Sequence, residues 1–77
     1  MTYQELLAKA AAGVTIEGDT YYSYSANVEF PNGAVLFCSY RYRAGKGRTL
    51  EFNYAAPGEK YFKAKRITKA RAMELLK

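Results

Sequence analysis

The sequence of 77 residues predicts an α+β fold with an N-terminal helix, a three- to four-stranded antiparallel meander sheet and a C-terminal helix. Apolar and polar residues alternate over residues 20–56, which is typical of strands that bury one face. Two glycine-containing turns divide this region, and apolar residues at helical spacing occur near both ends of the chain. No repeat or linker interrupts the sequence, so residues 1–77 are expected to form a single compact domain.

The first helix is expected over residues 3–12. Thr2 and Glu5 have the spacing of a capping box, in which each side chain bonds the backbone N–H of the other residue. Gly13 is expected to end the helix in a left-handed conformation. Residues 14–19 are expected to form a brief strand or an extended linker, followed by a turn. The apolar stripe of the helix consists of Leu6, Leu7, Ala10 and Ala11.

The three strands of the meander are expected at residues 20–30, 34–44 and 48–56. Most even-numbered positions are apolar and most odd-numbered positions are polar, so the helices are expected to cover the even face. The expected even-face residues are Tyr22, Tyr24, Ala26, Val28, Phe30, Ala34, Leu36, Cys38, Tyr40, Tyr42, Leu50, Phe52, Tyr54 and Ala56.

Two three-residue turns set the predicted register of the meander. A turn at Pro31-Asn32-Gly33 pairs Phe30 with Ala34 and Tyr24 with Tyr40, and it keeps all even residues on one face. A turn at Gly45-Lys46-Gly47 pairs Tyr42 with Leu50, Tyr40 with Phe52 and Cys38 with Tyr54. This register also places Arg41 opposite Glu51.

The segment after the meander has two interpretations. Residues 60–67 alternate weakly and fit a fourth, edge strand, where lysine is well tolerated. A helix that starts at Pro57 is the competing interpretation. The last helix is expected to begin at Lys69, after Thr68 as its N-cap, and to continue to the C-terminus.

Composition argues against an enzyme. The chain has no histidine, which removes the commonest general base and zinc ligand, and its lone Cys38 can form no intramolecular disulfide. Cys38 is expected to be a small buried residue. Gly45-Lys46-Gly47-Arg48 lacks the spacing of a phosphate-binding loop. We therefore expect no catalytic residue, metal or cofactor, and the absence of a signal peptide or long apolar run predicts a cytoplasmic protein with no membrane contact.

Charge is distributed unevenly along the chain. Residues 1–40 carry one lysine and four carboxylates, a net charge of −3, whereas residues 41–77 carry eleven cations and three carboxylates, a net charge of +8. This asymmetry suggests a polyanionic partner for the second half. On the odd face, Phe37 and Val35 are expected to be exposed beside Arg41, where aromatic and basic side chains could stack bases and hold phosphates.

The sequence thus predicts a small, stand-alone, non-catalytic protein that binds nucleic acid or an acidic nucleoprotein surface. The candidate contacts are Phe37, Arg41, Arg43, Lys46, Arg48, Lys60, Lys63, Lys65, Arg66, Lys69 and Arg71.

Two alternatives remain open at the level of sequence. One is an inhibitor that blocks a host nucleic-acid-handling complex by protein–protein contact, because the chain is similar in size and style to small phage proteins such as anti-CRISPR proteins. Its anchors would be Tyr21, Val35 and Phe37. The other is a homodimeric structural module that pairs through its exposed sheet face or through the edge at residues 60–67.

Overall fold

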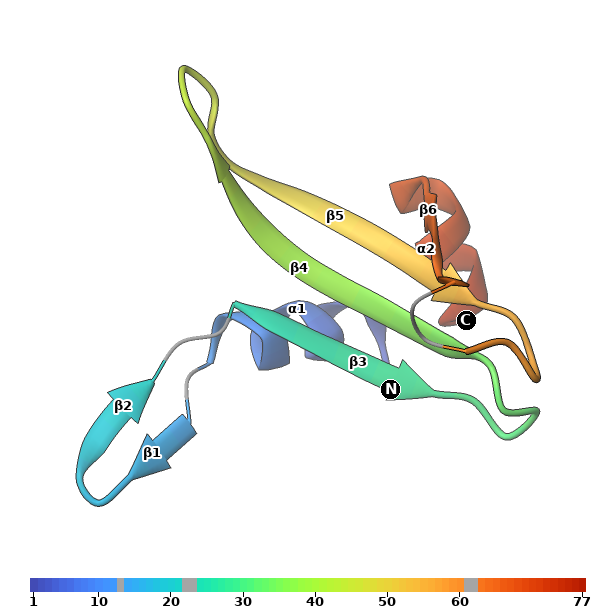
Figure 1. The fold of residues 1–77 in the computed structure, drawn as a ribbon, viewed down its shortest axis with the longest axis horizontal. Coiled ribbons are helices and arrows are strands. Elements are labelled where there is room, and N and C mark those ends of the chain that lie inside the picture. Colours follow the sequence, from blue (N-terminus) through green and yellow to red (C-terminus); the bar gives the residue numbers. More distant parts are fainter. Residues whose placement is uncertain (13, 22–23, 61–62) are drawn as a thin grey trace.

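A computed structural model describes residues 1–12, 14–21, 24–60 and 63–77 (Figure 1). The four-stranded sheet has the order β3-β4-β5-β6 with antiparallel neighbours, and β1 and β2 form a separate two-stranded hairpin. This architecture confirms the predicted α+β class. In chain order the elements are α1 (Tyr3–Ala11), β1 (Val14–Ile16), β2 (Asp19–Tyr21), β3 (Ser25–Glu29), β4 (Val35–Arg43), β5 (Gly47–Ala55), β6 (Lys65–Ile67) and α2 (Lys69–Leu75).

Helix α1 begins with the predicted capping box. The Glu5 backbone N–H donates to Thr2 Oγ1 at 3.1 Å, and the Thr2 backbone N–H donates to Glu5 Oε1 at 3.2 Å. The helix ends at Ala11, with Ala12 as its C-cap, one residue earlier than expected. The prediction for Gly13 lies outside the described residues.

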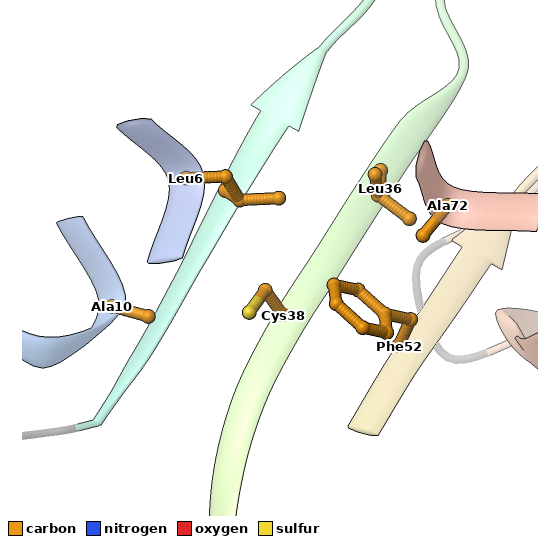
Figure 2. Close-up of a cluster of buried hydrophobic side chains, with 6 residues drawn as sticks. All are labelled: Leu6, Ala10, Leu36, Cys38, Phe52 and Ala72. Atoms are coloured by element: carbon orange, nitrogen blue, oxygen red, sulfur yellow. The ribbon is translucent and has the colours of Figure 1, made fainter. Parts of the chain in front are cut away.

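Both helices pack on the even face of the sheet, as predicted. Leu6 and Ala10 of α1 and Ala72 of α2 meet side chains of β4 and β5 in one buried cluster (Figure 2). Leu6 is 0 % exposed, which shows how completely α1 covers this part of the sheet. The strand residues of the cluster are Leu36, Cys38 and Phe52.

The prediction of one continuous strand over residues 20–30 is wrong. Strand β2 ends at Tyr21 and pairs with β1, whereas β3 begins at Ser25. Just before β3, Tyr24 has a φ of +54°, which lies outside the extended region that a strand requires. The β1–β2 turn has positive φ at Glu17 (+53°) and Gly18 (+84°), as in the two-residue turns that suit a twisted hairpin. The predicted even-face residue Tyr22 lies outside the described residues.

The register of the β3–β4 hairpin is as predicted. The Phe30 N–H donates to the Ala34 carbonyl at 2.8 Å across the three-residue turn, and Ala26 faces Cys38. The turn is stabilised locally, because the Ala34 N–H donates to Asn32 Oδ1 at 3.0 Å. Gly33 supplies the left-handed residue, with a φ of +89°.

The register of the β4–β5 hairpin differs from the prediction by two residues. Arg43 faces Gly47 and Tyr40 faces Leu50, so the turn comprises residues 44–46. Gly45 has a φ of +79° and Gly47 a φ of +72°. Because glycine stands at both positions, the sequence allows the turn to begin at either of two places, and a shift of two residues leaves every side chain on its expected face.

The pairs predicted from the second register change accordingly. Arg41 faces Thr49 rather than Glu51, and Glu51 faces Ser39. Cys38 faces Phe52 rather than Tyr54.

The segment after β5 ends in a short edge strand. Strand β6 pairs with β5 so that Ile67 faces Phe52, which settles residues 65–67 as a strand and excludes a helix starting at Pro57. Thr68 caps α2 as predicted, since its Oγ1 accepts from the Arg71 N–H at 3.2 Å. Helix α2 ends at Leu75, short of the C-terminus. Among the described residues, no helix combines the length and apolar character needed to cross a membrane.

Candidate nucleic-acid interface

Residues 41–49, which we call the arm, extend beyond both neighbouring strands of the sheet. On one side, the Tyr40 N–H donates to the Tyr24 carbonyl at 2.8 Å, and the described part of β3 reaches no further along β4. On the other side, β6 pairs only with residues 52–54 of β5. Figure 1 shows the β4–β5 hairpin projecting away from the rest of the molecule.

The size of the molecule agrees with this projection. The radius of gyration is 13.3 Å, whereas a compact chain of this length would have about 11.5 Å. Three strand residues on each side of the turn add roughly 10 Å of length, at about 3.4 Å per residue. The arm is therefore a two-stranded ribbon, and no strand among the described residues pairs with either of its outer edges.

The arm is strongly basic. Its sequence contains Arg41, Arg43, Lys46 and Arg48 and no carboxylate. Arg41, Lys46 and Arg48 are exposed, and the structure does not describe the side chain of Arg43. The two faces of the ribbon share these cations, because Arg41 belongs to the odd face and Arg48 to the even face.

The even face of the arm is aromatic. Tyr42 is 79 % exposed and faces Arg48 across the ribbon. The guanidinium carbon of Arg48 lies 4.2 Å from the centre of the Tyr24 ring, within the range of a cation–π contact. Tyr40, two residues before Tyr42 on the same face of β4, is half-buried and packs against the core cluster. The apolar core thus ends between Tyr40 and Tyr42.

On the odd face, a buried carboxylate fixes two arginines. Glu51 Oε2 lies 3.0 Å from Arg41 Nε, and its Oε1 lies 3.6 Å from Arg66 Nη1. The Glu51 side chain is only 8 % exposed, whereas the two arginine side chains are 65 % and 64 % exposed. Ser39 lies opposite Glu51, and Arg41 is two residues further along β4. Arg41 is therefore a diagonal neighbour of Glu51, which a long side chain can reach. The ion pair holds the base of the arm to β6.

At the centre of the odd face we expected an exposed surface for base stacking, and this region is more buried than predicted. Val35 is only 2 % exposed, so the expectation of an exposed Val35 is wrong. Phe37 is half-buried and lies between Asn27 and Asn53 on the neighbouring strands. The side chain of Tyr21, the third expected anchor of a protein interface, is outside the described part of the chain.

Of the basic residues after β5, Arg66 shares Glu51 with Arg41 of the arm, and the others lie on different parts of the surface. Lys65 faces Tyr54 and therefore belongs to the even side of β6, whereas Arg66 belongs to the odd side. Lys60 and Lys63 are exposed in the preceding loop.

The two basic residues of α2 have local partners. Lys69 Nζ lies 5.8 Å from the centre of the Tyr3 ring, and Arg71 Nη1 lies 3.6 Å from Glu74 Oε1. The predicted contacts thus form an arm, a pair of arginines around Glu51 and a scattered group near α2, and they do not form one continuous patch.

Tyr42 is the residue that sequence reasoning missed. Its even position assigned it to the core face, where the helices were expected to cover it. The sequence carried no signal for this, because residues 20–30 and 34–44 predicted strands of equal length, whereas in the structure β4 has nine residues and β3 has five. At the far end of β4 and β5, no other strand of the described ranges pairs beside Tyr42.

The described residues contain no group of three or more histidine, cysteine, aspartate or glutamate side chains placed to hold a metal. Cys38 is fully buried, and this burial raises the pKa of its thiol. Comparisons of the chain with protein-family models, with curated proteins and with solved structures find no match.

Proposed function

We propose that this protein is a non-catalytic binding protein that engages nucleic acid through the arm. The observation that carries the proposal is the concentration of four cations and no carboxylate in nine residues that project from the sheet. Cations arranged in this way neutralise phosphates and release condensed counterions, which supplies most of the affinity of a weakly specific nucleic-acid binder. A projecting ribbon presents them with little steric hindrance from the rest of the chain.

The remaining basic residues extend this contact without defining it. Arg66 lies at the base of the arm, and its guanidinium group remains largely exposed beside Glu51. Lys60, Lys63 and Lys65 are exposed on the loop and strand that follow β5. They raise the local positive potential, which speeds the encounter with a polyanion.

The test compares two charge reversals of equal size. In the arm variant, Lys46→Glu is combined with Arg48→Glu; in the matched control, Lys9→Glu is combined with Lys77→Glu, on exposed residues outside the arm. Both variants lower the net charge of +5 by the same amount. Binding to fluorescently labelled oligonucleotides is measured by anisotropy over a series of salt concentrations.

We expect the arm variant to lose at least about tenfold in affinity, and the slope of log K against log salt to become shallower by about 1.4 to 1.8 as two phosphate contacts are lost. The control should keep most of its affinity and its slope. Equal losses in the two variants would mean that net charge alone drives binding. No binding of the unmodified protein at low salt would refute the proposal.

A protein partner is the second candidate, and the exposure of Tyr42 is the observation that favours it, since tyrosine is enriched among interface hot spots. An inhibitor of a host complex would retain its protein partner in a pull-down from a nuclease-treated lysate.

A homodimer, the other alternative, would be detected by light scattering. A cytoplasmic setting suits either function, because the lone Cys38 needs no oxidising compartment.

A further inference from the structure

We propose that the arm binds single-stranded nucleic acid, DNA or RNA, by stacking an unpaired base on Tyr42. This inference rests on the proposed function and adds to it the class of nucleic acid and the residue that contacts the base. It moves the stacking surface from Phe37, at the centre of the odd face, to the even face of the arm.

The placement of Tyr42 leaves its ring available for stacking. The Tyr40 N–H points towards β3. Backbone N–H and C=O groups two residues apart in a strand point to the same side, so those of Tyr42 also point away from β5. Tyr42 and Arg48 therefore form a non-hydrogen-bonded pair, in which side chains lie closest together. Arg48 lies over the ring of Tyr24 instead, and Tyr42 remains 79 % exposed.

The buried core does not account for this tyrosine. The cluster around Leu36, Cys38 and Phe52 ends with Tyr40 and Leu50 packed at its margin, and Tyr42 lies one pair further out. Tyr42 is the most exposed large apolar side chain among the described residues.

Charge complementarity identifies the occupant. Arg48 lies beside Tyr42 on the same face, and Lys46 follows at the turn, so a stacked base would have two cations near its phosphates. Stacking on an aromatic ring combined with a basic backbone path is how proteins bind single strands without sequence preference. A duplex hides the faces of its bases, so an aromatic ring on an open ribbon favours the single strand.

The test uses Tyr42→Ala and Tyr42→Phe with oligothymidylate, oligouridylate and a DNA duplex of equal length. Tyr42→Ala should weaken single-strand binding by roughly 5- to 150-fold, which corresponds to the loss of one stacked base. Tyr42→Phe keeps the ring and should bind like the unmodified protein. Because neither substitution changes charge, the salt dependence of binding should stay the same. The oligothymidylate and oligouridylate arms show whether DNA or RNA is preferred.

Fluorescence gives a second readout. The chain has no tryptophan and eight tyrosines, so its intrinsic emission comes from tyrosine, and stacking should quench the part that Tyr42 contributes. Tyr42→Ala should abolish that part of the quenching. The thermal melting curve should be unchanged in both variants, because the side chain makes little contact with the core.

The possible failures are distinguishable. If the protein binds single strands and duplex equally and Tyr42→Ala has no effect, the stacking inference is overturned, while the electrostatic function of the arm stands. If Tyr42→Phe loses as much affinity as Tyr42→Ala, the hydroxyl and not the ring makes the contact, and the inference is also overturned. If the unmodified protein binds none of the three ligands, both proposals fail.

Discussion

Replacing Glu51 by glutamine should destabilise the fold and strengthen nucleic-acid binding. Glu51 is the carboxylate that the structure places, nearly buried, between Arg41 and Arg66. Glutamine has nearly the same size, so the substitution removes the negative charge without leaving a cavity. The two arginines remain exposed enough to be hydrated when they lose their partner.

The size of the destabilisation follows from these exposures. A pair between exposed groups contributes up to about 1 kcal/mol, and a hydrogen bond to a charged group somewhat more. Two such contacts, each with one partner about two-thirds exposed, predict a loss of about 1–2 kcal/mol. An unfolding entropy of about 2.1 cal/mol/K per residue then lowers Tm by roughly 6–12 °C.

The assay is thermal unfolding followed by circular dichroism, with Glu74→Gln as the matched control. Glu74 pairs with Arg71 at 3.6 Å, but both side chains are more than half exposed, at 67 % and 53 %. Its loss should lower the stability by less than about 0.5 kcal/mol. Similar Tm shifts for the two variants would refute the argument from burial.

The same variant should bind nucleic acid more tightly. The substitution raises the net charge of the chain by one and releases two guanidinium groups at the base of the arm. Anisotropy at low salt should show a gain of a few fold that disappears at high salt. Weaker binding by a folded Glu51→Gln variant would mean that Glu51 positions these arginines for the ligand.

Three further predictions concern the fold. Leu36→Ala removes a fully buried side chain and should cost about 2–5 kcal/mol in chemical denaturation; a loss below about 1 kcal/mol would show that the core is loosely packed. Native Cys38 should react slowly with a thiol reagent and rapidly in denaturant, because it is buried and its thiol pKa is raised; equal rates would contradict its burial. The pKa of Glu5 is lowered by its hydrogen bonds with Thr2, so its contribution to stability is present above its ordinary value of 4.5 and is lost as the pH falls through the lowered pKa. Glu5→Gln should therefore flatten the acid side of the plot of Tm against pH, and an unchanged plot would exclude this role.

Local chemistry predicted most of the helices and turns. The capping box of Thr2 and Glu5 and the N-cap at Thr68 each satisfy backbone N–H groups within a few residues, so neither depends on the rest of the fold. The alternation of apolar residues identified the buried face, including Leu36 and Cys38. These features are local or periodic, and a single sequence contains the information they need.

The errors arose where the pattern leaves two solutions. Alternation distinguishes registers that differ by one residue, but it does not distinguish registers that differ by two. The Arg41–Glu51 ion pair did not help, because a long side chain reaches a directly opposite and a diagonal carboxylate equally well. The break before β3 was also hidden, since nothing in the composition of residues 20–30 marks Tyr24 for a φ of +54°.

The two-residue shift decides where the core ends and where the candidate interface begins. In the predicted register Tyr42 would face Leu50, and the apolar face would extend to this pair, with only Ala44 and Arg48 paired on that face between it and the turn. In the structure Leu50 faces Tyr40, and Tyr42 instead faces Arg48. The shift therefore replaces an apolar contact by an aromatic–basic pair and lengthens the part of the ribbon that the core does not cover. An isolated two-stranded ribbon is marginally stable in water, so this end of the hairpin depends on the sheet at its base, where Glu51 ties Arg41 to Arg66.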